Sequence, residues 1–315
     1  MSNILLTMAE DRELTRDEHF AVKLEVDEGD CYDFSAGLQA LGHEVFFANW
    51  DDLGELEFSR LFHDNAKRFI TPPPLSSMDL IFVYKMEGFY FDLPRFFGMV
   101  RRFAEAAPLV VNDPATIRHN IDKRYLFELE RAGIRVPPTR LIDDSLRERI
   151  AGGEPFVLKP ISGERGRGVT LVRTTEEFDA AIAGHEEEYL AQEFIPGISE
   201  GERSLVFLGF EYQHAILKRP ANAGEFRCNE SRGGTVERYE PTAAEMDFAL
   251  SVLRAYESFG CPIHYSRIDL IESERGLMLM EAELINPSIF ARYCGRGEEF
   301  GKKIAAYFEG LLRRR

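Results

Sequence analysis

Short apolar runs alternate with segments of helical spacing through the first 111 residues, and this alternation restricts the fold more than any other feature of the chain. The predicted strands cover 3–8, 43–49, 79–84 and 109–111, and the predicted helices between them cover 32–41 and 91–107. Strands that are separated by helices form parallel sheets. The sequence therefore predicts an N-terminal α/β unit. Residues 9–30 are charged and weakly periodic, so they are predicted to form a surface loop or an extension.

The rest of the chain predicts a mixed arrangement of helices and strands. Asn112-Asp113-Pro114 is a turn with a helix N-cap, and one helix is expected over 115–132, before the composition changes at Val136-Pro137-Pro138. The further predicted strands are 139–142, 155–160, 189–195, 204–208, 214–217, 264–272 and 277–284, and the further helices are 146–151, 176–183, 243–259 and one from about 298.

Charge and cysteine content exclude several classes of function. The chain of 315 residues has 38 Lys and Arg against 54 Asp and Glu, a formal charge of −16, which disfavours binding to nucleic acid or to anionic membranes. The four cysteines are widely spaced and form no CxxC pair, so a zinc site is not expected. Neither a signal peptide nor a membrane span is predicted, and a cytoplasmic location is expected.

A glycine-rich loop between two β-rich runs is the first candidate site. It lies within 155–172, carries Gly163, Gly166 and Gly168, and follows Lys159 at the end of a predicted strand. Glycines let backbone amides approach phosphate closely, and the lysine would place an ammonium against a phosphate oxygen. The loop leads into a strand and lacks Gly-Lys-Ser/Thr, so it is not a Walker A motif. The alternative is a plain hairpin with a surface lysine.

Three weaker signals accompany this loop. Lys123 lies on the helix predicted after residue 114, where a lone lysine is usually solvated. The run Ala191-Gln-Glu-Phe-Ile-Pro196 is an apolar strand stopped by proline, whose backbone could read adenine, and Glu202 could hold ribose hydroxyls. The alternatives are a core strand that leaves its sheet and an exposed acid in a loop.

Three acids are expected to converge on a strand pair near the C-terminus. Glu281 and Glu283 face the same side of their strand, and the turn at 273–276 brings Asp269 beside them. Three close carboxylates repel each other unless a cation lies between them, and hard oxygen ligands suit Mg²⁺. The alternative is an edge strand whose acids face water.

A polar loop over 224–234 contains a candidate for charge stabilisation. Arg227 could stabilise negative charge that develops on a phosphoryl group, and Asn229 with the amides of Gly233 and Gly234 could add hydrogen bonds. A flexible surface loop is the alternative.

The order of these segments resembles the ATP-grasp superfamily, and within it the bacterial glutathione synthetases. The similar stretches are Val-Val-Asn-Asp-Pro (110–114) with Asp122-Lys123, Val-Leu-Lys-Pro (157–160) with its glycine loop, Ala-Gln-Glu-Phe-Ile-Pro (191–196), Gly201-Glu202, Gly-Glu-Phe-Arg-Cys-Asn (224–229) with Gly233-Gly234, and Ile-Asp-Leu-Ile (268–271) with Glu-Ala-Glu (281–283). The resemblance implies an α/β (α+β) ATP-grasp fold over 112–315, with a lid at about 137–195, preceded by a Rossmann-like pre-ATP-grasp domain over 1–111.

The resemblance also implies an enzyme, a ligase that joins a small carboxylate to an amine through an acyl phosphate. ATP would be bound by Lys123, Lys159, Ser162, Gly163, Gly166, Gly168, Gln192, Glu193, Phe194, Ile195 and Glu202. Substrates would contact Arg227, Asn229, Gly233, Gly234, Arg267 and Ser288, with Arg227 and Lys159 as the catalytic residues. Mg²⁺, or Mn²⁺ in its place, would bind Asp269, Glu281 and Glu283. The resemblance implies a homodimer or homotetramer, and neither nucleic acid nor membrane is expected as a partner.

Several departures from the glutathione enzymes widen the choice of substrate. Glu283 stands where they have asparagine, Ser204 where they have arginine, and Arg267 adds a charge that they lack; Tyr84–Gly88 replaces an Arg-Lys-Asp-Pro-Pro segment. The runs 217–220 and 281–288 are similar to the cycloserine-forming cyclo-ligases, which use an internal nucleophile. A natural-product ligase or cyclo-ligase is therefore the alternative to a peptide ligase. A non-catalytic nucleotide-binding protein is a third possibility, against which the lysines, Arg227 and the three acids argue together.

Overall fold

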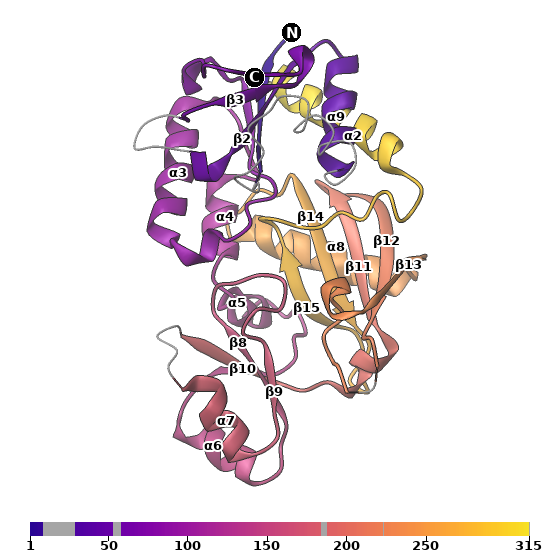
Figure 1. The fold of residues 1–315 in the computed structure, drawn as a ribbon. Coiled ribbons are helices and arrows are strands. Elements are labelled where there is room, and N and C mark those ends of the chain that lie inside the picture. Colours follow the sequence, from indigo (N-terminus) through magenta and orange to yellow (C-terminus); the bar gives the residue numbers. More distant parts are fainter. Residues whose placement is uncertain (9–28, 53–57, 184–187, 223, 315) are drawn as a thin grey trace.

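A six-stranded sheet built around the N-terminus forms the upper part of the molecule (Figure 1). The structure is a computed structural model that describes residues 1–8, 29–52, 58–183, 188–222 and 224–314, so the loop predicted over 9–30 lies almost wholly outside the described residues. The parallel strands are β1 (Asn3–Met8), β2 (Glu44–Asn49), β5 (Leu80–Phe82) and β6 (Val110–Val111). The predicted parallel sheet is thus confirmed.

Two short strands extend this sheet beyond the prediction. β3 (Leu61–His63) and β4 (Arg68–Ile70) pair antiparallel at the edge, in the order β4-β3-β2-β1-β5-β6. Runs of three residues give no reliable alternation of apolar and polar side chains. The sequence therefore carried no signal for them.

Helices cover both faces of the sheet because successive side chains of its strands point in opposite directions. Ile4 and Leu6 belong to the core beneath α2 (Gly29–Ala40) and α9 (Gly297–Arg313), whereas Leu5 belongs to the core beneath α3 (Leu93–Ala106). The C-terminal helix therefore completes the N-terminal sheet, and both chain ends lie near it (Figure 1).

Two antiparallel sheets make up the rest of the molecule. The smaller has the order β7-β10-β8-β9, from β7 (Thr139–Leu141), β8 (Phe156–Pro160), β9 (Thr170–Val172) and β10 (Tyr189–Glu193), and packs against α6 (Asp144–Ala151) and α7 (Thr175–Ile182). The larger has the order β13-β12-β11-β14-β15, from β11 (Glu202–Leu208), β12 (Glu211–Arg219), β13 (Thr235–Tyr239), β14 (Tyr265–Ile271) and β15 (Met278–Glu283), and packs against α8 (Ala243–Ser258). Of these strands, only β13 was not predicted.

The single helix predicted over 115–132 is wrong, because α4 (Pro114–Asn120) and α5 (Tyr125–Arg131) are separated by a turn that carries Lys123. The Asn120 side chain donates to the carbonyl of Ala282 at 2.7 Å and accepts from the amide of Leu284 at 3.1 Å. The amide of Lys123 donates to the carbonyl of Ile161 at 2.9 Å. The amide of Lys123 therefore bonds outside the helix, and the side chain of Asn120 fixes the end of α4 against β15.

Among the residues described, no helix is both long and apolar enough to cross a membrane.

Candidate active site

Both antiparallel sheets contribute residues to a cavity of about 400 Å³. The predicted site residues that line it are Lys123, Lys159, Gly163, Gly166, Gln192, Glu193, Phe194, Ile195, Glu202, Arg227, Asn229, Arg267, Asp269, Glu281, Glu283 and Ser288. Four other predicted residues, Ser162, Gly168, Gly233 and Gly234, lie outside its lining. Segments far apart in the sequence thus meet at one place.

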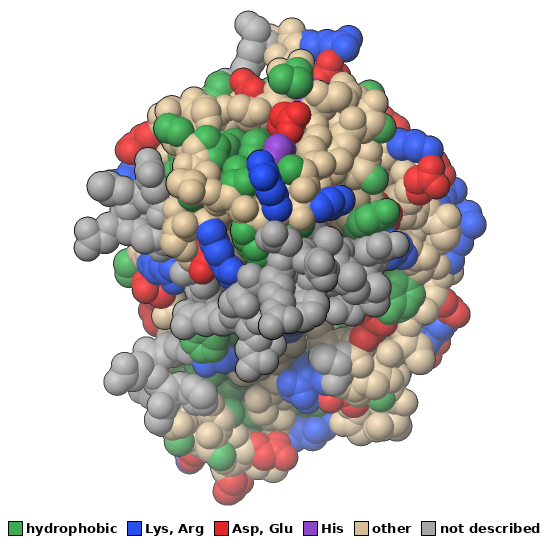
Figure 2. Space-filling model, turned by 45° about the horizontal axis from the view of Figure 1, so that its top comes forward, with side chains coloured by type: hydrophobic (Ala, Val, Ile, Leu, Met, Phe, Trp, Pro, Cys, Tyr) green, Lys and Arg blue, Asp and Glu red, His purple; other side chains and the backbone are tan. Residues whose placement is uncertain are grey.

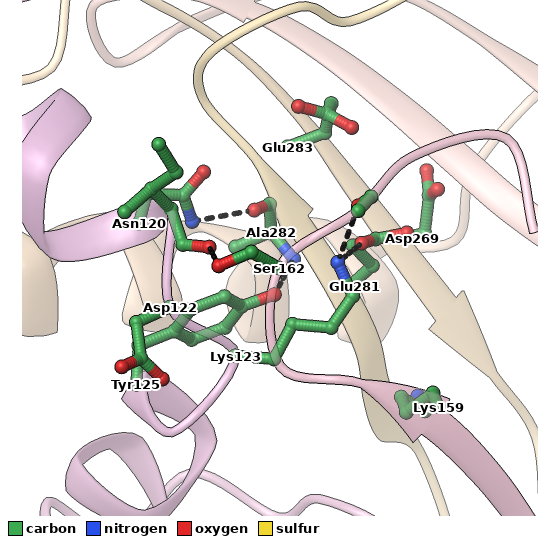
Figure 3. Close-up of polar contacts among 12 residues, drawn as sticks. Asn120, Asp122, Lys123, Tyr125, Lys159, Ser162, Asp269, Glu281, Ala282 and Glu283 are labelled. Carbon is green, nitrogen blue, oxygen red and sulfur yellow. Dashed lines mark hydrogen bonds and ion pairs between the residues drawn. The ribbon is translucent and has the colours of Figure 1, made fainter. Parts of the chain in front are cut away.

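Lys123 reaches from its turn toward β15 and the glycine loop (Figure 3). Its Nζ lies 3.1 Å from Oε1 of Glu281 and donates to the carbonyl of Gly163 at 2.9 Å. Burial alone would lower the pKa of this ammonium, but Glu281 and Glu283 raise it above its ordinary value. Lys123 therefore stays charged, and it joins the loop to the acidic strand.

Lys159 lies at the end of β8, and its Nζ donates to Oε1 of Gln192 on β10 at 2.7 Å. Gln192 donates in turn to the hydroxyl of Thr139 at 2.9 Å, so its side chain orients the lysine. Burial lowers the pKa of the Lys159 ammonium to about 8, although Glu281 acts in the opposite direction. A buried ammonium whose fixed neighbour is a neutral amide is suited to receive an anionic ligand.

The strand pair β14–β15 brings the three predicted acids together. Glu281 pairs with Asp269 in register, and Glu283 lies opposite Arg267. Ala282 points the other way, and its amide donates to the hydroxyl oxygen of Tyr125 at 3.1 Å. Figure 3 shows the acids on the side of the strand that faces the lysines.

The two glutamates of β15 have opposite electrostatic environments. Enclosure alone would raise the pKa of Glu281, but Lys123 and Lys159 lower it. Enclosure and the neighbouring charge of Glu281 raise the pKa of Glu283. The positive charges near Glu283 therefore compensate its carboxylate less than Lys123 and Lys159 compensate the carboxylate of Glu281.

Asp269 already has two cationic partners. Arg267 donates to both of its carboxylate oxygens at 2.8 Å, and Lys218 lies 3.1 Å from one of them. Burial alone would raise the pKa of Asp269, but Arg267 and Lys218 lower it far below its ordinary range. Lys218 also forms an ion pair with Glu202, the predicted ribose ligand, whose pKa is raised by burial.

The cavity also has an apolar wall, made of Val157, Phe194, Ile195, Ile198, Phe226 and Met280. Most of these side chains belong to one small hydrophobic cluster between β10, β14 and β15. The side chain of Glu193 is held by Arg149 at 3.2 Å and by Arg275 at 2.9 Å. A flat aromatic base would pack against such a wall.

The glycine loop crosses the cavity with several residues in the left-handed region. Gly166 (φ +68°) approaches the side chain of Asn229 so closely that a Cβ would lie 3.0 Å from its Oδ1. Gly168 (φ +67°) lies over Pro160, where a Cβ would meet Cγ at 2.7 Å. Ser162 anchors the loop through its hydroxyl, which donates to the carbonyl of Ile121 at 3.0 Å.

Arg227 lines the cavity with its guanidinium held in place. Nε and a terminal nitrogen donate to Glu225 at 2.8 and 2.9 Å, and the other terminal nitrogen donates to the carbonyl of Val169 at 3.0 Å. The hydrogen bonds from Arg227 lower the pKa of Glu225 to about 2. The amides of Gly233 and Gly234 donate within their own turn, to the carbonyls of Glu230 and Asn229.

Comparison with known proteins agrees with this geometry. Residues 123–297, more than half of the chain, match the RimK-like ATP-grasp domain. The chain belongs to the RimK-like ATP-grasp family. A probable alpha-L-glutamate ligase of Azotobacter vinelandii is 30% identical over 73% of this chain and 81% of its own length. One of Cellvibrio japonicus is 29% identical over 71% of this chain and 78% of its own.

Solved structures show the same ATP-grasp fold. D-cycloserine synthetase DcsG superposes with a TM-score of 0.76 at 19% identity, covering 98% of this chain and 99% of that one. D-alanine–D-alanine ligase from Bacillus anthracis, complexed with ATP, has a TM-score of 0.65 at 16% identity, covering 100% and 98%. This chain is therefore an enzyme, an ATP-grasp ligase, as the sequence predicted.

Several residues of the ATP-grasp cavity were not predicted as site residues. They include Lys218 on β12, Glu164 and Arg165 in the glycine loop, Lys85 and Glu87 after β5, and Asn286 after β15. Lys218 had a usable signal, since it is a charged residue in a strand that is otherwise apolar over Ala215–Leu217. The other side chains lie in loops, where no periodicity marks the buried face.

The cavity of this ATP-grasp ligase differs in charge from the whole chain. Eight of its lining residues are Lys or Arg and eight are Asp or Glu, a formal charge of 8 − 8 = 0, against −16 for the chain. Figure 2 shows acidic and basic side chains interspersed over the described part of one face. The lining is thus less negative than the chain as a whole, and its lysines and arginines are available to a polyanionic ligand.

ATP-grasp ligases use ATP together with divalent metal ions. In the described part of the chain, no three acidic, histidine or cysteine side chains form a preassembled metal site. The donor set nevertheless fits a hard cation, since Glu281 and Glu283 offer carboxylate oxygens on one strand face. Burial, and after it the neighbouring charge of Glu281, raise the pKa of Glu283, and a bound cation would offset the repulsion between the two carboxylates.

Proposed function

We propose that this enzyme uses ATP to activate a substrate carboxylate and then joins it to an amine, forming an amide bond on an amino acid or a small peptide. The observation that carries the proposal is the buried Lys159, whose pKa is lowered to about 8. It faces the same cavity as the acids of β14 and β15. A phosphate chain that lies between these charges would restore full protonation of the lysine.

The proposed nucleotide position follows from the lining. The base packs on the wall formed by Val157, Ile195 and Met280, and the phosphates extend toward Lys123 and Lys159. Glu281 and Glu283 would hold Mg²⁺, or Mn²⁺, and Asp269 would be the third ligand, in exchange for one of its cationic partners. When bound, the metal neutralises charge on the phosphate oxygens.

The chemistry that we propose has two steps. A carboxylate oxygen of the substrate attacks the γ-phosphorus and the bond to the β,γ-bridging oxygen breaks. This gives an acyl phosphate, and ADP departs with the bridging oxygen. The amine nitrogen then attacks the acyl carbon, phosphate departs with the electron pair, and the amine loses a proton to solvent. Arg227, held by Glu225 and Val169, is placed to stabilise charge that develops on the transferred group.

Glutamate is the first substrate to test, because the sequence relatives at 29–30% identity carry the name alpha-L-glutamate ligase. A second candidate is an intramolecular ligase of the cycloserine type. The run at 217–220, which resembles the cyclo-ligases, contributes Lys218 to the cavity, where it pairs with Asp269. The two candidates share the first step and differ in the source of the amine.

Product analysis tests the proposal. The enzyme is incubated with MgATP and a pool of amino acids and dipeptides that includes glutamate, and the products are identified by mass spectrometry beside released phosphate. Amide formation that requires a separate amine supports the leading candidate. Product from a single organic substrate identifies a cyclo-ligase, and phosphate release without any amide across the pool contradicts both.

A further inference from the structure

Two consecutive residues of the glycine loop are each connected to one glutamate of β15. The carbonyl of Gly163 accepts from Lys123, which pairs with Glu281. Oε2 of Glu164 accepts from Nδ2 of Asn286 at 2.9 Å, and the amide of Asn286 donates to Oε1 of Glu283 at 3.2 Å. The position of the loop is therefore tied to both acids.

Glu164 also connects the loop to the N-terminal part of the chain. Its Oε1 accepts a hydrogen bond of 2.9 Å from the amide of Gly88, which follows β5 and has a φ of +77°. Glu164 is half-buried, and burial raises the pKa of its carboxyl. One carboxylate thus joins three segments that are distant in the sequence: the glycine loop, the segment after β5 and the exit of β15.

The neighbouring contacts of the loop are weaker. Arg165 forms an ion pair with Glu87, but their side chains are 63% and 43% exposed, and exposed pairs contribute little. Arg167 lies over the rings of Tyr90 and Phe91 at 5.1 and 4.8 Å, also near the surface. Hydrogen bonds to a partly buried carboxylate are stronger, so Glu164 is the main attachment of the loop on this side.

We propose that Glu164 is a positioning residue that latches the glycine loop over the cavity and keeps water from the acyl phosphate. This inference rests on the proposed function for the part that concerns the acyl phosphate. Water that reaches this species hydrolyses it to carboxylate and phosphate, so ATP is consumed without amide formation. A loop held at Gly88 and Asn286 closes the side of the cavity next to β15.

Hydrogen exchange of the ligand-free protein tests the latch without any activity. The amide of Gly88 is itself the donor to Glu164, so its exchange reports the contact directly. In Glu164→Ala, exchange at Gly88 and across 161–169 should become about tenfold faster, because two hydrogen bonds to a charged group are lost. The matched control is Glu154→Gln, an exposed acid next to the smaller sheet that pairs with Arg149. Unchanged exchange in Glu164→Ala would overturn the latch.

A donor–acceptor exchange separates positioning from a general structural role. Asn286→Asp places a second carboxylate opposite Glu164 and should open the loop, whereas E164Q/N286D restores a donor facing an acceptor. Phosphate released per amide formed should rise several-fold in Glu164→Ala and in Asn286→Asp, and return toward the parent ratio in the double variant. If loop exchange rises while this ratio stays constant, the shielding role is wrong. Absence of amide from the parent enzyme would contradict the proposed function, while exchange alone would still decide the latch.

Discussion

Arg267 donates to both carboxylate oxygens of Asp269, through Nε and through a terminal nitrogen, each at 2.8 Å. The side chain of Asp269 is 2% exposed, and its only other cationic partner in the described structure is Lys218. The carboxylate predicted to bind a metal is therefore paired with two cationic side chains. Metal binding at Asp269 would require a rearrangement of these cations.

Arg267→Met should destabilise the protein by about 3 kcal/mol at neutral pH, because it leaves a buried carboxylate with only one cation. The folded-state pKa of Asp269 lies below its usual value of about 3.9, so its ion pairs stabilise the fold above that value and are lost as pH falls through the lower one. The variant should thus unfold at a higher pH during acidification. Urea unfolding across pH measures both effects. The control Arg219→Met, in an exposed pair with Glu237, should lose less than about 1 kcal/mol; an equal loss would contradict the role of burial.

Lys159 should take up protons when nucleotide binds. With a pKa of about 8, Lys159 is neutral in roughly half of the enzyme molecules at pH 8 before nucleotide binds. Nearby phosphates favour its charged form. Binding of MgATP at pH 8 should therefore take up as much as about half a proton per site. Titration calorimetry in buffers of different ionisation enthalpy measures this uptake. A guanidinium at this position is always charged, so Lys159→Arg should show no uptake; equal uptake in both proteins would assign the proton to another group.

Glu281→Ala should lower turnover by at least about 100-fold. It removes a carboxylate from the face of β15 next to which the ATP phosphates are proposed to bind. Glu281 is half-buried and its partner Lys123 keeps a hydrogen bond to Gly163, so the fold should persist. Phosphate release and thermal unfolding are measured together. Glu237→Ala, on the edge strand β13, serves as the control with an exposed acid. Retained turnover in Glu281→Ala would show that Glu281 is not a functional residue of the site.

Glu283→Gln should stabilise the metal-free enzyme and weaken its response to divalent cations. It removes one of the converging charges while it keeps an oxygen that can accept from the amide of Asn286. The variant should therefore unfold at a higher temperature than the parent without metal, and gain less when MgCl₂ or MnCl₂ is added. Thermal unfolding with and without each salt is the measurement. An equal metal-dependent gain in both proteins would show that Glu283 is not a ligand.

Local patterns predicted much of the fold and the site. Glu281 and Glu283 share a strand face because side chains alternate along a strand, and the turn after β14 brings Asp269 opposite them. The same rule places Arg267 and Asp269, two residues apart, on one face of β14, so this ion pair could have been predicted from the sequence. The motif order located the cavity even where the helical assignment of Lys123 was wrong.

Other features depend on contacts between distant segments. Lys218 reaches Asp269 from β12, on the far side of β11, and strand order within a sheet is not encoded in any local pattern. The turn at Lys123 contacts distant segments: the side chain of Asn120, the last residue of α4, bonds to β15, and the amide of Lys123 donates to the carbonyl of Ile161. The attachment of Glu164 to Gly88 likewise joins residues 76 positions apart. Such contacts follow from the complete fold, so the sequence pattern could not give them.

The crossing of α2 and α9 provides a stability test away from the cavity. A Cβ at Gly37 would lie 2.3 Å from the carbonyl oxygen of Gly301, so the two helix backbones touch there. Gly37→Ala should destabilise the protein by about 1–3 kcal/mol, because one helix must move away from the other. Gly310→Ala is the matched control, since a Cβ there meets nothing within 4 Å and alanine favours a helix by up to about 1 kcal/mol. Urea unfolding should therefore shift in opposite directions for the two variants. A shift of the same sign would mean that the helix contact adapts, and that the C-terminal helix is not held to the N-terminal sheet at this point.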